Sequence, residues 1–318
     1  MTLLEIKDLK QHFPIKKGFF GENRIVKAVD GVSFTLEKGE TLGVVGESGC
    51  GKSSLGRSIL RLVEPTAGEI KFKGTDISSF TRKQMKELRR DMQIVFQDPF
   101  ASLNPRNTIR TILEAPLKIH SIGNRDERMN IIERLVEKIG IRKDQLDNYP
   151  HEFSGGQRQR IGIARALTLN PELIIADEPV SALDVSVQSQ VLNLLVDLQK
   201  EFNLSYIFIS HDLSVVQHIS DRVAVMYLGK VVELADVDSL YNTPLHPYTK
   251  SLLSALPIPD PSIKRSRIIL QGDLPSPINP PSGCAFHTRC PVATAACKTE
   301  IPQLREMEMN HWASCIHI

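Results

Sequence analysis

The first residues whose types and spacing could do chemistry form a glycine-rich stretch near the N-terminus. Residues 46–53, GESGCGKS, match the pattern G-x-x-x-x-G-K-[ST] and follow an apolar run, ETLGVV, that predicts a buried strand. Glycines let backbone N–H groups turn inward around phosphate oxygens, and the next helix adds a partial positive charge at its start. We therefore predict a phosphate-binding loop made of Gly46, Ser48, Gly49, Cys50, Gly51, Lys52, Ser53 and Ser54.

Three residues of this loop have separate expected roles. Lys52 should reach the β- and γ-phosphates of a bound nucleotide, and the Ser53 hydroxyl should ligate Mg²⁺. Cys50 is interpreted as a small filler, with a redox switch on nucleotide binding as the alternative.

A second chemical feature is a pair of carboxylates after an apolar run. Residues 173–176, LIIA, predict a buried strand, and Asp177 and Glu178 follow directly. Ligands of α/β proteins bind at the carboxyl ends of parallel strands. Asp177 should hold Mg²⁺ there, and Glu178 should orient and polarise an attacking water. An acidic pair alone also fits a solvated turn, so this assignment depends on the phosphate loop.

The composition is that of a globular protein. Of 318 residues, 39 are Lys or Arg and 37 are Asp or Glu, so the formal net charge is +2. No basic block concentrates this charge, which argues against a nucleic-acid partner. No apolar run approaches the ~20 residues that span a bilayer, and residues 1–10 lack the apolar centre of a secretory signal. We expect a cytosolic chain whose membrane role, if any, is through partners.

Strand and helix patterns alternate along the first 255 residues, which predicts an α/β fold with a mainly parallel sheet. Residues 107–147 are charged and amphipathic, and they predict a helical subdomain, about residues 98–165, inserted into that core. After residue 255 the chain is proline-rich and then cysteine-containing. We therefore expect two domains, residues 1–255 and 256–318. The expected strands cover residues 3–9, 28–36, 40–45, 69–73, 92–96, 172–176, 205–209 and 222–227, and the expected helices cover residues 52–62 and 186–200 and begin near residues 81 and 154.

Further motifs resemble those of ATP-binding-cassette (ABC) ATPases. Residues 153–160, FSGGQRQR, resemble the family signature, and residues 181–184, SALD, resemble the D-loop and end in Asp184. Gln97 resembles the Q-loop glutamine, and His211 resembles the switch histidine. The motifs follow the family's order over residues 1 to about 255. The resemblance implies a P-loop NTPase of the ABC type that binds ATP and Mg²⁺ and hydrolyses ATP.

The resemblance also implies roles for single residues. Gln97 would ligate Mg²⁺ and sense the γ-phosphate, and His211 would contact the γ-phosphate as part of the catalytic site. The alternatives are a solvated loop glutamine and a satisfied surface histidine. Phe13 is in the position of the adenine-stacking aromatic residue, with Phe19 and Phe20 as rivals.

The signature has a physical reading of its own. Ser154 and Gln157 have capping-box spacing, so Ser154 should cap a helix, and Gly155 and Gly156 should leave backbone N–H groups open to an anion. The resemblance implies that these four residues act in trans, on the γ-phosphate held by a second ATPase subunit. ATP would then hold two subunits together, and hydrolysis would release them.

Three stretches are similar to the ATPase subunits of dipeptide and oligopeptide importers: VKAVDGVSFTLEKGETLGVVGESGCGKS, HPYTKSLLSALPIPDP and LPSPINPPSGCAFHTRCP. The resemblance implies a peripheral location on the cytoplasmic face of the inner membrane. Its implied partners are a similar but non-identical ATPase subunit, two transmembrane permease subunits and, indirectly, an extracytoplasmic solute-binding protein. The same importer class also carries nickel chelates, glutathione and sugars, so the solute stays open.

Four of the five cysteines lie within the last 35 residues: Cys284, Cys290, Cys297 and Cys315. In a reducing compartment such a group favours a metal over disulfides. The spacing lacks the tight pairs of ordinary zinc fingers, and thiolates suit both zinc and iron–sulfur clusters. The importer resemblance implies a 4Fe–4S cluster at these four residues, with Zn²⁺ or free thiols as alternatives. We interpret the nearby His287, His311 and His317 as solvated.

Two other functions compete with transport. A soluble ABC ATPase acting on DNA, ribosomes or cluster assembly usually shows coiled coils, basic faces or duplicated cassettes, which this sequence lacks. A non-hydrolysing regulatory cassette would need a degenerate Glu178 or His211, and both are intact.

Overall fold

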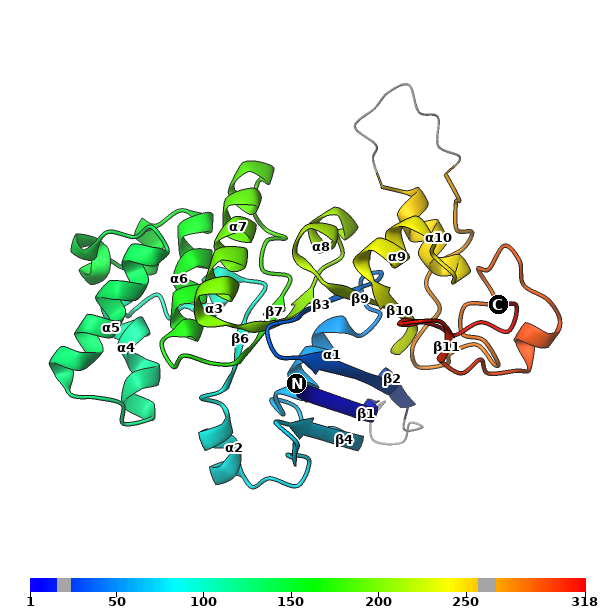
Figure 1. Ribbon diagram of the computed structural model, residues 1–318, viewed down its shortest axis with the longest axis horizontal. Helices are drawn as coiled ribbons and strands as arrows, with labels where there is room; N and C mark the ends of the chain where they lie inside the picture. Colours follow the sequence, from blue (N-terminus) through cyan, green and yellow to red (C-terminus); the bar gives the residue numbers. More distant parts are fainter. Residues whose placement is uncertain (16–23, 257–266) are drawn as a thin grey trace. The chain divides into compact units, whose positions relative to one another are not determined.

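The structure is a computed structural model that describes residues 1–15, 24–256 and 267–318. It contains two compact units, each assembled from segments that are distant in the sequence (Figure 1). Unit 1 comprises Met1, Glu37–Glu40 and Ser79–Ile209, and unit 2 comprises Thr2–Leu36, Thr41–Ser78 and Ser210–Ile318.

Unit 1 combines a parallel sheet with a group of helices. Its three strands run in the order β8-β7-β6, and Leu173 pairs with both Met92 and Ser205. Every residue of β7 and β8 is buried, as the apolar runs predict for parallel strands covered on both faces. The elements are α2 (Arg82–Leu88), β6 (Met92–Val95), α3 (Pro99–Ser102), α4 (Ile109–Ile119), α5 (Arg125–Lys138), η1 (Lys143–Asp147), η2 (Pro150–Glu152), α6 (Gly155–Leu167), β7 (Leu173–Asp177), α7 (Val185–Phe202) and β8 (Ser205–Ile209).

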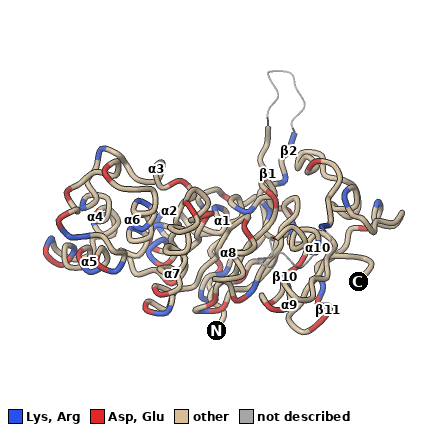
Figure 2. Tube along the Cα trace, turned by 90° about the horizontal axis from the view of Figure 1, so that it is seen from above, with Lys and Arg blue, Asp and Glu red and all other residues tan. Residues whose placement is uncertain are grey.

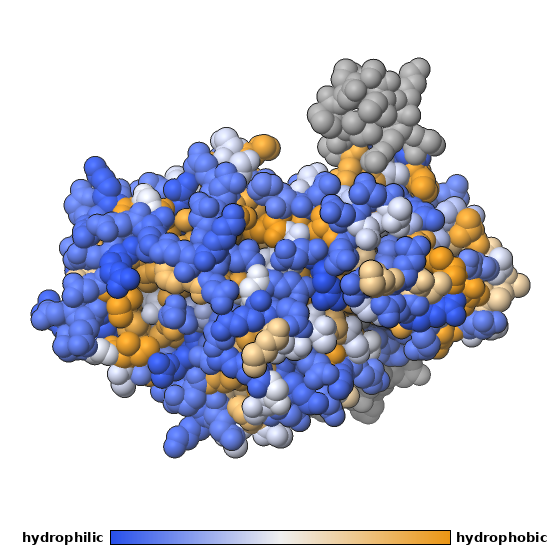
Figure 3. All heavy atoms as spheres, viewed as in Figure 1, coloured by the Kyte–Doolittle hydropathy of each residue, from blue (hydrophilic) through white to orange (hydrophobic). Residues whose placement is uncertain are grey.

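The helices α4 to α6 and the segments that join them share an apolar core, which includes Leu113, Ile132, Phe153 and Ile161. In Figure 1, α4 and α5 lie side by side, and residues of both signs of charge alternate along α5 (Figure 2). Figure 3 shows hydrophobic residues reaching the surface among hydrophilic ones over these helices. Helices were expected between residues 107 and 147, and α4 and α5 confirm them.

Unit 2 is built around two sheets. One has the order β2-β1-β4-β5, with β4 antiparallel to both of its neighbours, and the other contains the run β11-β12-β10-β9-β3. The elements are β1 (Thr2–Ile15), β2 (Arg24–Glu37), β3 (Thr41–Val45), α1 (Lys52–Ile59), β4 (Ala67–Phe72), β5 (Thr75–Asp76), α8 (Leu213–Ile219), β9 (Arg222–Tyr227), β10 (Lys230–Asp236), α9 (Val237–Asn242), α10 (Pro247–Ser254), η3 (Ala296–Lys298), β11 (Arg305–Glu308) and β12 (His311–Ala313).

The expectation of a mainly parallel sheet is wrong for unit 2. Over the described residues of this sheet in unit 2, β3 and β9 pair in parallel, whereas β9, β10, β12 and β11 pair antiparallel in succession. A tight turn at Leu228 and Gly229, both with positive φ, joins β9 directly to β10 and so makes that pair antiparallel. The expected first helix also ends early, at Ile59, because Arg61 takes a left-handed conformation with φ of 47°.

The C-terminal tail is attached to unit 2 by strand pairing and by a buried hydrogen bond between side chains. β12 extends the sheet beside β10, and the Nε2 atom of His311 lies 2.7 Å from the Glu233 carboxylate. His311 is 1% exposed and Glu233 is fully buried, so the interpretation of His311 as solvated is wrong. A tail histidine can be buried because Glu233, 78 residues earlier, supplies a partner.

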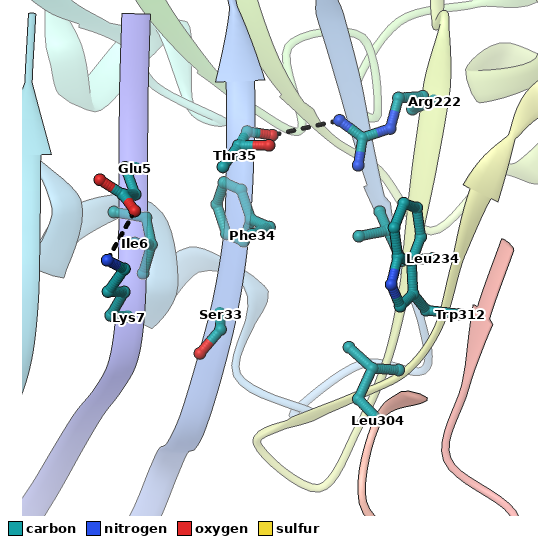
Figure 4. A pocket seen from close by; sticks show the side chains of 10 residues that line it. All are labelled: Glu5, Ile6, Lys7, Ser33, Phe34, Thr35, Arg222, Leu234, Leu304 and Trp312. Atoms are coloured by element: carbon teal, nitrogen blue, oxygen red, sulfur yellow. Dashed lines mark hydrogen bonds and ion pairs between the residues drawn. The ribbon is translucent and has the colours of Figure 1, made fainter. Parts of the chain in front are cut away.

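Trp312 of β12 lines a pocket of about 340 Å³ within unit 2. Figure 4 shows Trp312 and Leu304 on one side and Phe34 of β2 on the other, with Arg222 bonded to the Thr35 carbonyl at 3.2 Å. None of the predicted phosphate-binding or cysteine residues lines it. Over the residues that the structure describes, no helix is both long and apolar enough to cross a bilayer.

Candidate active site

The phosphate loop lies between β3 and α1, in the strand–loop–helix context that the motif requires. Gly46, Gly49 and Gly51 all have positive φ, of 151°, 83° and 108°. A Cβ on Gly46 would lie 2.2 Å from the Met226 carbonyl oxygen, and one on Gly51 would lie 1.9 Å from the Ala28 carbonyl oxygen. At these two positions glycine is required by space as well as by conformation.

Lys52 is 5% exposed, and its Nζ atom donates to the carbonyl oxygens of Gly46 (2.8 Å) and Glu47 (3.2 Å). The lysine is thus folded back over its own loop. Cys50 is 1% exposed, and burial raises the pKa of its thiol, which fits the interpretation as a filler. Ser48 is exposed, while Ser53 and Ser54 are partly exposed in the first turn of α1.

The two predicted acidic residues lie where β7 ends. Asp177 is 2% exposed at the carboxyl end of β7. Glu178 has φ of 47°, an uncommon conformation for a residue with a side chain, and its N–H donates to the Ile209 carbonyl oxygen at 3.0 Å. The Gln97 side-chain amide donates to Glu178 Oε2 at 3.0 Å, although the two residues are 81 positions apart. The structure therefore brings together two of the predicted site residues.

The predicted capping box of the signature is confirmed. The Gln157 N–H donates to Ser154 Oγ (3.3 Å), and the Ser154 N–H donates to Gln157 Oε1 (2.9 Å). A Cβ on Gly155 would make only an ordinary contact, 3.6 Å from Leu183, which leaves that side of the helix start accessible. A Cβ on Gly156 would lie 2.2 Å from Val187 Cγ1 of α7. Gly156 therefore serves helix packing, a role that its sequence context did not reveal.

Asp184 of the D-loop is the N-cap of α7. Its carboxylate accepts hydrogen bonds from Ser186 Oγ (2.7 Å) and the Val187 N–H (3.0 Å). The hydrogen bond from Ser186 is the main reason that the pKa of Asp184 is lowered. Asp184 thus has a structural role within unit 1, whatever it contacts in an assembly.

His211 is exposed in unit 2, next to Asp212, which caps α8. Phe13 is partly exposed near the end of β1. Phe19 and Phe20, its rivals for the adenine contact, lie outside the described residues.

The four tail cysteines do not form the expected thiolate site in this structure. Over residues 1–15, 24–256 and 267–318, no three or more His, Cys, Asp or Glu side chains are placed to hold a metal ion. Cys297 is instead buried, with its Sγ 3.3 Å from His317 Nε2 and 3.6 Å from the Thr294 hydroxyl. His317 is exposed but contacts this thiol, and His287 Nδ1 lies 2.8 Å from the Cys284 carbonyl oxygen, so neither is simply solvated.

The four thiols do lie in one region of unit 2. Burial raises the pKa of the Cys284 thiol, and the proximity of the Cys297 and Cys315 thiols adds to that rise. Burial likewise raises the pKa of Cys290, with Cys284 the largest charge contribution. The soft donor set suits iron–sulfur or zinc, but the side chains do not converge on one point.

The sequence reasoning missed three residues that contact the phosphate loop or belong to it: Glu47, Tyr248 and Arg289. Tyr248 and Arg289 lie 201 and 242 residues after Glu47. The stretch HPYTKSLLSALPIPDP marked the region of Tyr248, but no local pattern indicates its contact.

Two family models match the chain. Residues 29–181 match the ABC transporter family, and residues 232–297 match the C-terminal region of oligopeptide/dipeptide transporters. The second match covers α10 and most of the cysteine segment.

Curated relatives match along the whole length. The oligopeptide transport ATP-binding protein AppF of Bacillus subtilis is 60% identical, over 99% of this chain and 97% of AppF. The putative oligopeptide transport ATP-binding protein YkfD of the same organism is 55% identical, over 99% and 95%. The chain belongs to the family of ABC transporter ATP-binding proteins and is an ATPase.

Solved structures agree on the fold. The dimeric ATP-binding cassette MJ0796 in a post-hydrolysis state with ADP and Pi has a TM-score of 0.66 and 28% identity, over 74% of this chain and 99% of that one. CbiO1 of Clostridium perfringens, part of the ABC transporter complex cbiONQ, has a TM-score of 0.65 and 27% identity, over 76% and 91%. The ABC ATPase fold predicted from the sequence is thereby confirmed.

Proposed function

We propose that this chain is the ATP-hydrolysing subunit that energises import of di- or oligopeptides through a membrane ABC transporter. The observation that carries ATP hydrolysis is the phosphate loop at residues 46–53, whose glycines adopt the required backbone between a buried strand and a helix. Peptides are favoured because the oligopeptide/dipeptide C-terminal region matches and because AppF is an oligopeptide transport protein.

The proposed chemistry is positioning and charge stabilisation of phosphoryl transfer to water. Lys52 and the loop N–H groups would bind the phosphates, while Ser53, Gln97 and Asp177 would hold Mg²⁺. Bound Mg²⁺ would neutralise developing charge on the phosphates. Glu178 would orient the attacking water and accept its proton, and the hydrogen bond from Gln97 holds that carboxylate in place before reaction.

The catalytic role of Glu178 has a direct test. Glu178→Gln keeps the side-chain shape but removes the base, so kcat for ATP hydrolysis should fall by roughly 10² or more while ATP binding is retained. Glu172→Gln is the matched control, because Glu172 directly precedes β7 and pairs with Lys38 at 3.1 Å. Wild-type turnover by Glu178→Gln would remove Glu178 from the mechanism. If the partner ATPase differs, its own site must first be inactivated.

We also propose that a second, similar ATPase subunit and two permease subunits are the partners, with the signature residues 154–157 and His211 acting at the composite ATP sites. An extracytoplasmic solute-binding protein would deliver the solute, and the chain would sit on the cytoplasmic face of the inner membrane. The names of the relatives support a transport assembly.

The helical segment of unit 1 is the proposed contact with the permease subunits. It lies between Gln97 and the signature in sequence, and Phe100 and Ile119 are 63% and 58% exposed. Replacing Ile119 with Ser should reduce transport in the assembled complex while basal ATPase activity stays near normal. Unchanged transport by Ile119→Ser and by Phe100→Ser would count against this surface.

The solute has its own test, because nickel chelates, glutathione and sugars are alternatives in the same class. Uptake of labelled di- and oligopeptides by cells with the intact complex, compared with cells carrying Glu178→Gln, distinguishes these solutes. Uptake of another solute with no uptake of peptides would leave the ATPase assignment and overturn the substrate.

We propose that residues 256–318 are a C-terminal domain of the oligopeptide-importer type, which follows an ATPase domain at 1–255 and packs within unit 2. We also propose that Cys284, Cys290, Cys297 and Cys315 bind a 4Fe–4S cluster. The cluster is supported by the number of thiols, by their softness as ligands and by their grouping in one region. The side chains as placed do not converge on one point. Anaerobically purified protein should be brown, with about four iron and four sulfide per chain. Tightly bound zinc without sulfide would indicate a zinc site, and no metal would mean four free thiols.

A further inference from the structure

The segment that carries Cys284 and Cys290 is anchored in unit 2 by an aromatic side chain. Phe286 is 1% exposed and packs against Tyr227 (ring centroids 5.2 Å apart), Tyr248 (5.3 Å) and His246 (5.7 Å). The Arg289 N–H then donates to the Phe286 carbonyl oxygen at 3.0 Å. Arg289 is therefore held by a turn whose position is set by packing in the core.

Arg289 reaches the phosphate loop. Its Nη1 and Nη2 atoms lie 2.8 and 3.1 Å from the two carboxylate oxygens of Glu47, a two-pronged ion pair. The Arg289 side chain is 9% exposed and that of Glu47 is 27% exposed. A two-pronged pair with this little exposure holds one geometry, unlike a surface ion pair.

The backbone of Glu47 is fastened as well. Its N–H donates to the Tyr248 hydroxyl of α10 at 3.0 Å, and its carbonyl oxygen accepts from the Cys50 N–H and from Lys52 Nζ, both at 3.2 Å. Every polar group of Glu47 thus has a partner. Two of those partners come from the C-terminal quarter of the chain.

We propose that Arg289 and Tyr248 are positioning residues for ATP binding, which hold Glu47 so that its carboxylate does not oppose the phosphates and its loop stays open to them. The proposal rests on the proposed function, because it requires that residues 46–53 bind ATP.

The reason is electrostatic. A loop that receives anionic phosphates has an acidic residue at its second position, and a carboxylate there would repel the phosphates and compete for Lys52. Arg289 compensates the charge and turns the carboxylate away, so that Lys52 contacts the loop carbonyls instead. Tyr248 fixes the backbone at the same residue. The tail thereby acts on the phosphate loop without contacting ATP.

The experiment measures the Kd of Mg–ATP for the full chain by titration calorimetry, with folding checked by circular dichroism. Arg289→Met should raise the Kd about tenfold or more, the effect of one uncompensated charge within ~10 Å at an effective dielectric constant of ~20. The double variant Glu47→Gln with Arg289→Met carries no uncompensated carboxylate, so it should recover most of the lost affinity. Tyr248→Phe, which keeps the ring, should weaken ATP binding by a smaller factor.

Arg305→Met is the matched control, because Arg305 bonds to the Ile318 carbonyl oxygen within the tail and does not contact the loop. It should bind ATP like wild type. Wild-type affinity in Arg289→Met would overturn the inference, and so would a double variant as weak as Arg289→Met, which would show that Arg289 only anchors the tail.

Arg289→Lys keeps the test decisive if Arg289→Met fails to fold. It retains the charge but loses the two-pronged contact, so a small rise in Kd is expected, and no rise would count against the inference. A wild-type chain that does not bind ATP would instead refute the proposed function.

Discussion

Glu233 should be the residue whose loss most weakens the attachment of the C-terminal tail. Its fully buried carboxylate accepts hydrogen bonds from three donors: the Leu245 N–H (2.7 Å), the His246 N–H (2.9 Å) and the ring of His311 (2.7 Å). Leu245 and His246 are consecutive residues that lead into α10, and His311 lies in β12. The Glu233 side chain of β10 therefore joins two other segments of unit 2.

The expected magnitude follows from those contacts. Each buried donor that loses its acceptor costs about 1–3 kcal/mol, and Glu233→Ala leaves three such donors. Water can enter the space that a truncated side chain leaves, which reduces the upper limit. We expect Glu233→Ala to lower the free energy of unfolding of this region by about 3–5 kcal/mol, a large share of a typical domain's stability.

The fluorescence of Trp312 reports unfolding of the tail itself. Trp312 is the single tryptophan of the chain and directly follows His311 in β12. Urea unfolding followed by its fluorescence should show a lower midpoint in Glu233→Ala, with earlier proteolysis of the tail. Glu308→Ala, an exposed glutamate at the end of β11, should change the free energy by no more than about 0.5 kcal/mol. A loss below about 1 kcal/mol in Glu233→Ala would refute the reasoning.

Three further predictions concern the same unit. Burial lowers the pKa of His246 from 6.5 to about 4, so the unfolded chain takes up this proton at a higher pH than the folded chain and stability falls as the pH drops below about 6.5. The free energy of unfolding measured in urea should fall by about 2 kcal/mol at pH 5, and His246→Asn should remove this pH-dependent loss. Burial raises the pKa of Cys50, so iodoacetamide at pH 8 should label it much more slowly in the native than in the urea-unfolded chain, and equal rates would contradict the placement. Gly51→Ala should abolish measurable ATP binding, because its Cβ would lie 1.9 Å from the Ala28 carbonyl oxygen. Gly49→Ala should reduce ATP affinity less, because a Cβ there has no neighbour within 4 Å, and equal affinities in the two variants would refute the steric argument.

Much of the fold could be predicted because its signals are local. Apolar runs located the buried strands β3, β7, β8 and β9 within a residue or two, since buried parallel strands need continuous apolar sequence. The tail strands β11 and β12 were not predicted. They are four and three residues long and contain no apolar run that would mark them in the sequence. They form because β10 offers a free edge with which β12 pairs.

The candidate site divides in the same way. The backbone conformation of a loop or helix start depends on adjacent residues, so the phosphate loop and the capping box of Ser154 could be recognised from spacing alone. The hydrogen bond from Gln97 to Glu178 spans 81 positions, and no spacing rule predicts it. The tail cysteines show the limit of composition, because four thiols in one region do not by themselves converge on a metal site.

The sequence by itself determined the class of protein, because the phosphate loop, the signature and the acidic strand end are short stretches whose chemistry depends on neighbouring residues. Only the tertiary structure decided which contacts the C-terminal quarter makes. Packing of Phe286 brings Arg289 to Glu47, and burial of Glu233 gives His311 a partner. These two contacts join residues that are 242 and 78 positions apart in the sequence. They depend on how the whole chain folds, so no single segment predicts them.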